Sequence, residues 1–303
     1  MKSIYNGKYS KVKKIGGGSF GFVYLVENID THKQYAMKKF YLDNLKEDSV
    51  IKQFNILKSL SSSHFVEAVE HFIQKDNHYL ITEYYANNLY DYVPKHLSMK
   101  TIKSLIYQLT KAIQYLHNNN YIHRDIKPDN ILLDKSGNIK ITDFDLVRQL
   151  PQSKEEQLTK NVVTLYYRAP EIFYGDVHYG KGVDVWSIGC VFGELITGEP
   201  LFKGRSELDT LGKIISFIGT PCEENWEGVS ELPNFLPFKV CEGNMKTVME
   251  GKVSNSGIEL LKGMLTLDPK KRFSCEEILG HKFFEEDEGI ATLEEMVKEM
   301  GLK

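Results

Sequence analysis

Short apolar runs and polar turns alternate along the first part of the chain. β-branched and aromatic residues concentrate in five runs: Tyr9–Ile15, Phe22–Asn28, Lys33–Phe40, Phe65–Ile73 and His78–Tyr84. Glycines and polar residues separate these runs, which is the pattern of an antiparallel sheet. Between the third and fourth runs, apolar residues recur at helical spacing over Glu47–Leu60. The pattern therefore predicts a β-rich region with one main helix.

The pattern becomes helical after Tyr85–Asn88. A long amphipathic helix is predicted from apolar residues spaced three and four apart: Ile102, Leu105, Ile106, Leu109, Ile113 and Leu116. Helical periodicity dominates again from Val183 onward, interrupted by turns that contain glycine and proline. We therefore predict an α+β fold with a small β-rich lobe, residues 1–85, and a larger helical lobe, residues 86–284.

An acidic tail, residues 285–303, follows the second lobe. Thr292 and Glu295 have the spacing of a helix capping box, and an apolar face follows them. This predicts a short helix that docks on its own domain, with binding of a partner protein as the alternative.

Composition and charge narrow the class of protein. The 303 residues are 42% hydrophobic and 26% charged, as in globular proteins and unlike disordered chains. Lys and Arg number 38 and Asp and Glu 41, a formal net charge of −3, so we expect no direct binding to nucleic acid or anionic membranes. The four cysteines are far apart, and no stretch approaches 18 uncharged apolar residues. A reducing compartment and no membrane span are predicted.

A glycine-rich motif lies between the first two predicted strands. Gly16, Gly18 and Gly21 form G-x-G-x-x-G, which allows backbone amides to approach phosphate oxygens. The motif alone is also compatible with a simple hairpin turn, and a dinucleotide-binding fold would require a helix where a strand is predicted. Lys38, in Ala36-Met37-Lys38 of the third run, matches the V-A-I-K pattern whose lysine holds nucleotide phosphates.

The stretch His123-Arg124-Asp125-Ile126-Lys127-Pro128-Asp129-Asn130 follows the long predicted helix. With it, the sequence resembles a eukaryotic protein kinase, whose catalytic loop reads H-R-D-L-x-x-x-N. The resemblance implies the bilobal protein-kinase fold. It also implies that Asp125 accepts the proton of the substrate hydroxyl, that Lys127 steadies the γ-phosphate and that Asn130 ligates Mg²⁺. Lys127 is typical of the kinases that phosphorylate serine and threonine.

Later motifs extend the resemblance to nearly the whole chain. Asp143 begins Asp-Phe-Asp in the place of D-F-G and is the implied second Mg²⁺ ligand, while Glu171 ends Ala-Pro-Glu and is expected to pair with Arg272. ATP and Mg²⁺ are the implied cofactors. Besides Lys38, the resemblance assigns ATP binding to residues near the glycine-rich turn, the third strand, the lobe boundary and the catalytic loop: Ile15, Gly16, Gly18, Gly21, Val23, Ala36, Glu83, Tyr85 and Leu132.

Two stretches, residues 161–171 and 206–221, are similar to cyclin-dependent kinases. This similarity implies a cyclin-type partner and protein substrates phosphorylated at Ser/Thr-Pro, with Val163 and Arg168 shaping the pocket for proline. It implies nuclear or cytoplasmic localisation, with the nucleus favoured. A faint resemblance over residues 232–239 is to the cyclin-dependent kinase of the general transcription factor that acts on the RNA polymerase II tail.

Thr159 occupies the family's activating phosphorylation site. Phosphate adds a charge of about −1.5 to −2, which orders a loop by pairing with cations. The resemblance assigns Lys52, Arg124 and Arg148 to this pocket. The alternative interpretation is that the two arginines only solvate an acidic loop.

Two departures from the family bear on activity. Gln53 stands where a helix glutamate normally pairs with Lys38, which predicts at best a neutral hydrogen bond between Gln53 and the lysine. Asp145 stands where the family has glycine, and its charge is expected either to repel ATP phosphates or to attract a cation. The stretch Glu47–Gln53 also departs from the cyclin-binding signature. The alternative function is therefore a cyclin-binding pseudokinase with little turnover.

Overall fold

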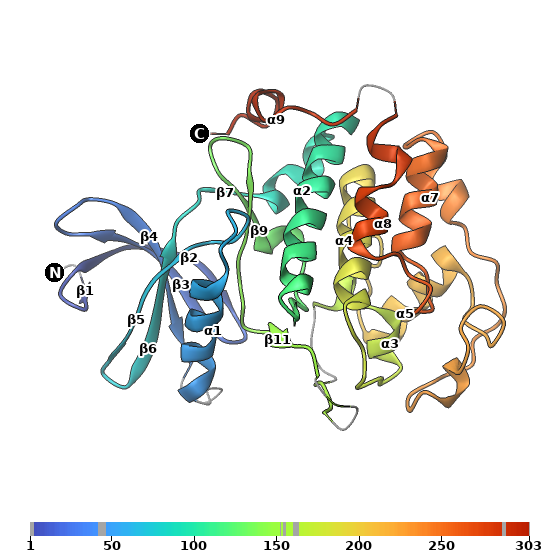
Figure 1. The fold of residues 1–303 in the computed structure, drawn as a ribbon, viewed down its shortest axis with the longest axis horizontal. Helices are drawn as coiled ribbons and strands as arrows, with labels where there is room; N and C mark the ends of the chain where they lie inside the picture. Colours follow the sequence, from blue (N-terminus) through green and yellow to red (C-terminus); the bar gives the residue numbers. More distant parts are fainter. Residues whose placement is uncertain are drawn as a thin grey trace. The chain divides into compact units, whose positions relative to one another are not determined.

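The computed structural model describes residues 3–41, 47–151, 153, 156–159, 164–286 and 289–302. The chain forms two compact units (Figure 1). The first comprises Met1–Ala86 and Lys140–Asp145, and the second comprises Asn87–Ile139 and Leu146–Lys303. The sequence division assigned Lys140–Asp145 to the second lobe. In the structure this segment belongs to the first unit, where the Val66 amide donates to the Ile141 carbonyl (3.1 Å).

The first unit contains a six-stranded antiparallel sheet in the order β1-β2-β3-β4-β6-β5. Its strands are β1 (Ile4–Tyr5), β2 (Tyr9–Gly18), β3 (Gly21–Asn28), β4 (Gln34–Phe40), β5 (Ala68–Gln74) and β6 (Asn77–Glu83). Helix α1 (Glu47–Ser59) packs against β5 and β6. The predicted strands and helix are confirmed, with the first strand longer at its end.

One face of this sheet carries an aromatic and aliphatic core of five buried residues: Tyr9, Val26, Met37, Tyr79 and Ile81. Successive side chains of a strand point to opposite faces, so Met37 in this core places its neighbour Lys38 on the other face. The turn into β3 needs a glycine. A Cβ on Gly21 would lie 2.1 Å from the Lys39 carbonyl oxygen on β4.

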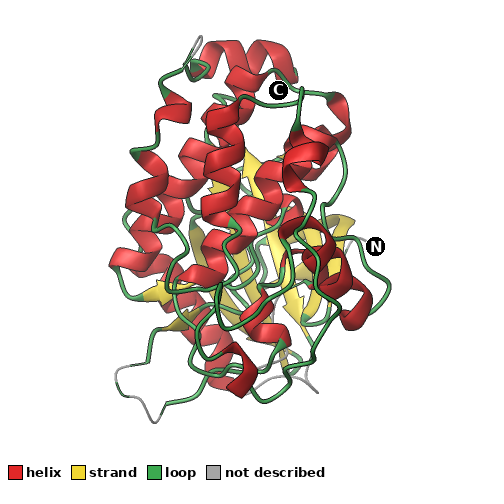
Figure 2. Ribbon diagram, turned by 90° about the vertical axis from the view of Figure 1, so that its right-hand side faces the viewer, coloured by secondary structure: helices red, strands yellow, loops and turns green. Residues whose placement is uncertain are grey.

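The second unit is mainly helical (Figure 2). Its α-helices are α2 (Met99–Asn118), α3 (Pro170–Phe173), α4 (Gly182–Thr197), α5 (Glu207–Ile218), α6 (Met245–Met249), α7 (Asn255–Met264), α8 (Cys275–Leu279) and α9 (Leu293–Met300). Helix α4 packs against α2 and α7. Thirteen of its residues, from Val183 to Leu195, are buried, so it forms the centre of this unit. The α+β class with a β-rich part and a helical part is confirmed.

Short strands flank the loops of the second unit. They are β7 (Asn87–Asn88), β8 (Tyr121–Ile122), β9 (Ile131–Leu133), β10 (Ile139–Ile141), whose last two residues belong to the first unit, and β11 (Arg148–Gln149). β8 pairs with β11 in an antiparallel ladder, and β7 pairs with β9. The loop between β8 and β9 carries the predicted catalytic residues Asp125 and Lys127, while Lys38 lies on β4 of the first unit.

Helix α9 of the acidic tail docks on its own unit. Thr292 and Glu295 form the predicted capping box, and Met296 and Met300 are buried. The Glu299 carboxylate accepts hydrogen bonds from the Ser98 hydroxyl (2.7 Å) and the Thr101 hydroxyl (2.6 Å) at the start of α2. The docking predicted for this helix is confirmed.

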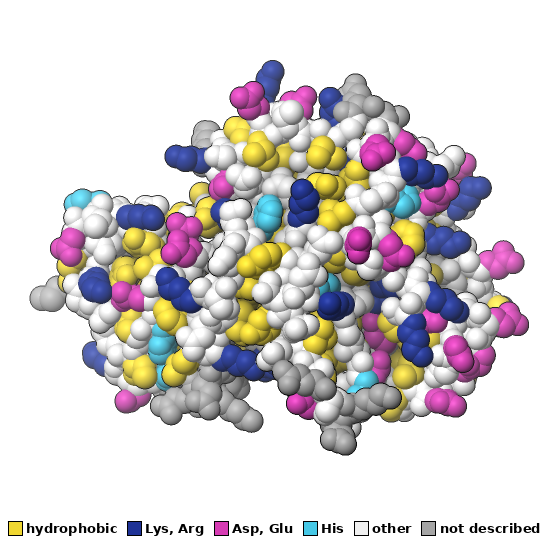
Figure 3. All heavy atoms as spheres, in the orientation of Figure 1, with side chains coloured by type: hydrophobic (Ala, Val, Ile, Leu, Met, Phe, Trp, Pro, Cys, Tyr) yellow, Lys and Arg dark blue, Asp and Glu magenta, His cyan; other side chains and the backbone are white. Residues whose placement is uncertain are grey.

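The surface charge is mixed. On the face drawn in Figure 3, lysines and arginines are interspersed with acidic side chains. Among the described residues, we find no helix with both the length and the apolar character that crossing a bilayer requires.

Candidate active site

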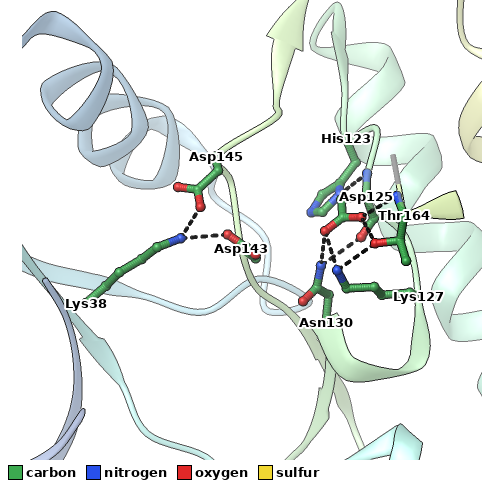
Figure 4. A network of polar contacts seen from close by, with 8 residues as sticks. All are labelled: Lys38, His123, Asp125, Lys127, Asn130, Asp143, Asp145 and Thr164. Atoms are coloured by element: carbon green, nitrogen blue, oxygen red, sulfur yellow. Dashed lines mark hydrogen bonds and ion pairs between the residues drawn. The ribbon is translucent and has the colours of Figure 1, made fainter. Parts of the chain in front are cut away.

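The Asp125 carboxylate is the centre of a polar cluster in the second unit (Figure 4). Its Oδ2 accepts hydrogen bonds from Lys127 Nζ (2.8 Å) and Asn130 Nδ2 (2.9 Å). Its Oδ1 accepts the Thr164 hydroxyl (2.8 Å), which in turn accepts a hydrogen bond from Lys127 Nζ (2.8 Å). The structure thus brings together the three residues that the sequence assigned to the catalytic loop, and adds Thr164.

A buried carboxylate holds the backbone of this loop. Asp184, in the first turn of α4, accepts the amides of His123 and Arg124, both at 2.8 Å, and the His117 ring at 2.9 Å. Burial opposes ionisation of Asp184, but the hydrogen bond and charge of His117 and the amide of Arg124 hold its pKa below the usual value. The loop is therefore tied to the most buried helix of the unit.

Lys38 is the centre of a second polar cluster, which lies in the first unit (Figure 4). Its Nζ donates to Asp143 Oδ1 (2.8 Å) and to Asp145 Oδ2. The other oxygen of Asp145 accepts a hydrogen bond from Gln53 Nε2 (2.6 Å) on α1. The predicted hydrogen bond between Gln53 and Lys38 is therefore wrong: the Gln53 amide donates to Asp145, and Asp145 contacts the lysine.

The charges in this cluster shift one another's ionisation. Burial lowers the pKa of Lys38, but Asp143 and Asp145 outweigh it and raise that pKa above its usual value. Burial and the Asp143 charge raise the pKa of Asp145 to about 7, against the opposing effect of Lys38. From the sequence, Asp145 was expected either to repel phosphates or to attract a cation. That expectation did not include Lys38, which contacts the Asp145 carboxylate in the structure.

Backbone geometry explains why aspartate fits at position 145. Asp143 has a φ of 64°, in the left-handed region that aspartate tolerates better than most residues. Asp145 is not among the described non-glycine residues with positive φ. This conformation therefore does not need glycine at position 145.

The residues assigned to ATP lie in both units. Within the first unit, β2 and β3 pair Gly16 with Val23 and Gly18 with Gly21. Ala36 on β4 pairs with Leu25 and Thr82, Ile15 on β2 is 39% exposed, and the Tyr85 hydroxyl donates to the Glu83 carboxylate (2.6 Å). Leu132 is half-buried on β9 of the second unit. Their contacts with ATP stay predictions.

Thr159 is exposed, and its hydroxyl accepts a hydrogen bond from Arg124 Nη1 (3.2 Å). The Tyr179 hydroxyl accepts from the same nitrogen (2.6 Å) and donates to the Thr159 carbonyl (2.8 Å). Burial lowers the pKa of Arg124, and within the described part of the chain its Nη2 is buried without a hydrogen-bond partner. Arg148 donates to the Val147 carbonyl (2.9 Å), and Lys52 is exposed on α1 of the first unit.

Arg168 of the predicted proline pocket forms an ion pair with Glu207, and its guanidinium lies 5.1 Å from the centre of the Phe173 ring. Val163, its predicted companion, lies outside the described residues. The ion pair expected between Glu171 and Arg272 is confirmed, with both guanidinium nitrogens bonded to the carboxylate at 2.8 and 2.9 Å.

Three residues of these clusters were missed by sequence reasoning: Thr164, Tyr179 and Asp184. Asp184 had a signal, because an acidic residue at the start of a mainly apolar helix needs buried donors. Thr164 and Tyr179 had none, since a hydroxyl in a loop is ordinarily solvated.

Comparison with known proteins agrees with this geometry. Residues 9–284 match the family model described as the protein kinase domain. The chain is also similar to a solved chain of the CAK complex from Chaetomium thermophilum bound to ATP-γ-S, with 35% identity and a TM-score of 0.83 over 95% of this chain and 94% of that one. The chain therefore belongs to the protein kinase family and, within it, to the cyclin-dependent kinases.

Proposed function

We propose that this protein is an active protein kinase that transfers phosphate from MgATP to serine or threonine followed by proline, together with a cyclin-type partner. The observation that carries the proposal is the arrangement of Lys127, Thr164 and Asn130 around the Asp125 carboxylate. Lys127 and Asn130 donate to its Oδ2, and Thr164 donates to its Oδ1. These contacts keep the carboxylate at one place in the loop. A residue so held can accept the proton of a substrate hydroxyl as the hydroxyl attacks phosphorus.

The remaining parts of phosphoryl transfer have residues of suitable chemistry. Lys127 is a cation at the catalytic loop, and Lys38 is the cation that the family uses for nucleotide phosphates. Asn130 and Asp143 provide the amide and carboxylate oxygens that Mg²⁺ prefers. When bound, Mg²⁺ neutralises phosphate charge. In our proposal Asn130 and Asp143 hold it, and ATP-γ-S in the related CAK complex supports a nucleotide of this type.

Thr159 is the proposed activating phosphorylation site. Its hydroxyl already contacts Arg124, a desolvated cation with one buried guanidinium nitrogen that has no partner within the described residues. A phosphate there gains charge-assisted hydrogen bonds, which are about twice as strong as neutral ones. Arg148 and Lys52 are the further cations that we assign to this phosphate.

The cyclin-type partner and the proline preference rest on family likeness and on two local features. Ile51, the residue kept from the family's cyclin-binding signature, is 44% exposed on α1. Arg168 is held by Glu207 and Phe173 beside the proposed proline pocket that Val163 completes. Nuclear localisation and action on the RNA polymerase II tail belong to the same proposal and rest on the sequence resemblance to cyclin-dependent kinases, including that over residues 232–239.

The test is phosphorylation of a Ser-Pro peptide by the full chain with its co-purified cyclin, with a Ser-Ala peptide as the specificity control. We expect transfer to the Ser-Pro peptide, and a loss of about 10²- to 10⁴-fold in the Asp125→Asn variant, because that change removes the proton acceptor. If the complex binds MgATP and shows no transfer that depends on Asp125, the protein is the pseudokinase instead.

A further inference from the structure

Gln53 and Asp145, the two departures from the kinase pattern, contact each other. Asp145 Oδ2 contacts Lys38, and Asp145 Oδ1 accepts the Gln53 amide at 2.6 Å, although these residues are 107 and 92 positions away in the sequence. All three belong to the first unit. The Asp145 side chain is 4% exposed and that of Lys38 is 16% exposed, so the contacts are made away from water.

A buried ammonium requires a nearby carboxylate. Desolvation of Lys38 without a counter-charge costs several kcal/mol. The helix residue that would supply this charge in the family is the neutral Gln53, and the Asp143 carboxylate is 32% exposed. Asp145 is the more deeply buried of the two acids on the lysine.

We propose that Asp145 is a positioning residue that replaces the helix glutamate as the buried carboxylate partner of Lys38, with Gln53 as its neutral anchor on α1. This inference deepens the proposed kinase function and rests on it. An acid at position 145 needs a hydrogen-bond donor at position 53, because a second carboxylate there would be a like charge at hydrogen-bond distance. An amide at position 53 in turn needs an acceptor.

The exchange leaves the number of carboxyl groups around Lys38 unchanged. In the usual arrangement one ammonium faces a helix glutamate and the metal-binding aspartate. Here one ammonium faces Asp143 and Asp145. Asp145 therefore adds no excess negative charge for ATP phosphates to meet. Only the backbone element that carries the second carboxylate has changed.

This relocation links two elements that the family joins less directly. The carboxylate partner of Lys38 now belongs to the Asp143–Asp145 segment, which also carries the proposed metal ligand Asp143. Phe144 anchors the segment by edge-to-face contact with Phe65, with ring centres 5.7 Å apart. Displacement of the segment removes both carboxylates from Lys38 and releases Gln53 on α1. The contact between Asp145 and Gln53 therefore couples the position of this segment to that of α1.

A double-mutant cycle on the full chain tests the proposal. The variants are Gln53→Glu, Asp145→Gly and the double variant, which recreates the usual family arrangement. We expect each single variant to lose about tenfold or more in kcat/KM for ATP, since neighbouring charged groups couple by amounts of this order. The double variant is expected to recover to within about threefold of the wild type.

Two readouts separate positioning of Lys38 from a general loss of structure. Misplacement of Lys38 raises the KM for ATP and lowers kcat, whereas partial unfolding lowers kcat alone by reducing the active fraction. Asn55→Glu adds an acid on the exposed face of α1, and Asp76→Gly removes an exposed acid at a φ of 59°. Neither control is expected to change MgATP affinity.

The same double-mutant cycle can be measured through the affinity of each variant for MgATP, a quantity that does not require turnover. A wild type without transfer that depends on Asp125 refutes the proposed function, while non-additive MgATP affinities still support the role of Asp145. Additive single effects, or a gain in affinity or rate from Asp145→Gly alone, overturn the role of Asp145 whether or not the wild type is active.

Discussion

The Asp125 and Lys38 clusters differ in how much sequence change each tolerates. Around Asp125, every residue of the expected catalytic loop is present, and a buried carboxylate fixes the loop through two backbone amides. Around Lys38, the expected acid is missing from α1 and another acid takes its place. Backbone amides of one loop need an acceptor at one position, whereas a flexible lysine needs only a carboxylate within reach. A charge partner can therefore change its place in the chain more easily than a backbone anchor.

The largest effect is expected from Asp184→Ala, which removes the anchor of the Asp125 cluster. It leaves the amides of His123 and Arg124 and the His117 ring without their buried acceptor. Loss of one partner from a buried charged network costs about 3–5 kcal/mol. Urea unfolding of the two proteins measures this cost. A loss below about 1 kcal/mol, the size of an ordinary surface change, contradicts the anchoring role.

The matched change at Lys38, Asp145→Asn, is expected to cost less stability than Asp184→Ala. The asparagine still offers an oxygen to Lys38 or Gln53, and Asp143 still contacts the lysine. We expect a loss of about 1–3 kcal/mol, because a charge-assisted hydrogen bond becomes neutral. The same urea titration gives the comparison. An equal or greater loss than at Asp184 means that the two clusters do not differ in this respect.

The pH dependence of stability distinguishes two buried acids of α4, Glu194 and Asp184. Glu194 of α4 is buried and accepts the Tyr167 hydroxyl at 2.8 Å. Burial raises its pKa from 4.5 to about 7, so between these values the folded protein binds more protons than the unfolded chain. Stability from this group is consequently present at low pH and lost as pH rises through this range. Asp184, with its lowered pKa, acts in the opposite direction.

Glu194→Gln removes the titration and keeps an acceptor for Tyr167. The variant is expected to gain up to about 3 kcal/mol over the wild type between pH 4.5 and pH 7.5, since each unit of pKa shift corresponds to 1.36 kcal/mol. Unfolding free energies of both proteins across this range give the difference, in which other titrating groups cancel. If the unfolding free energies of the two proteins change in parallel with pH, the pKa of Glu194 is not raised.

The smallest effect is expected at the tail. Thr292→Ala removes the side-chain acceptor for the Glu295 amide at the start of α9. Loss of such a cap costs about 0.5–2 kcal/mol. Thermal unfolding, with exposed Thr31→Ala as a comparison, measures it. An unchanged melting temperature would show that this cap does not contribute to the stability of the docked helix.

Sequence pattern predicted the elements of this fold because apolar periodicity records which face of a strand or helix is buried. It also predicted Asp125, Lys127 and Asn130, which lie within six residues of one another in a loop. The pattern could not predict that Gln53 contacts Asp145, because periodicity says nothing about which polar group faces another across 92 residues. Each residue taken separately suggested a defect. Their contact gives the pair a role.

The sign of one change in rate tests the central claim most directly. The full chain with its cyclin is assayed for phosphorylation of a Ser-Pro peptide before and after Asp145→Gly. Our account predicts that the rate falls by about tenfold or more, because Lys38 loses its buried carboxylate. A higher rate in the variant would show that Asp145 is an impediment at this site, and would contradict the account.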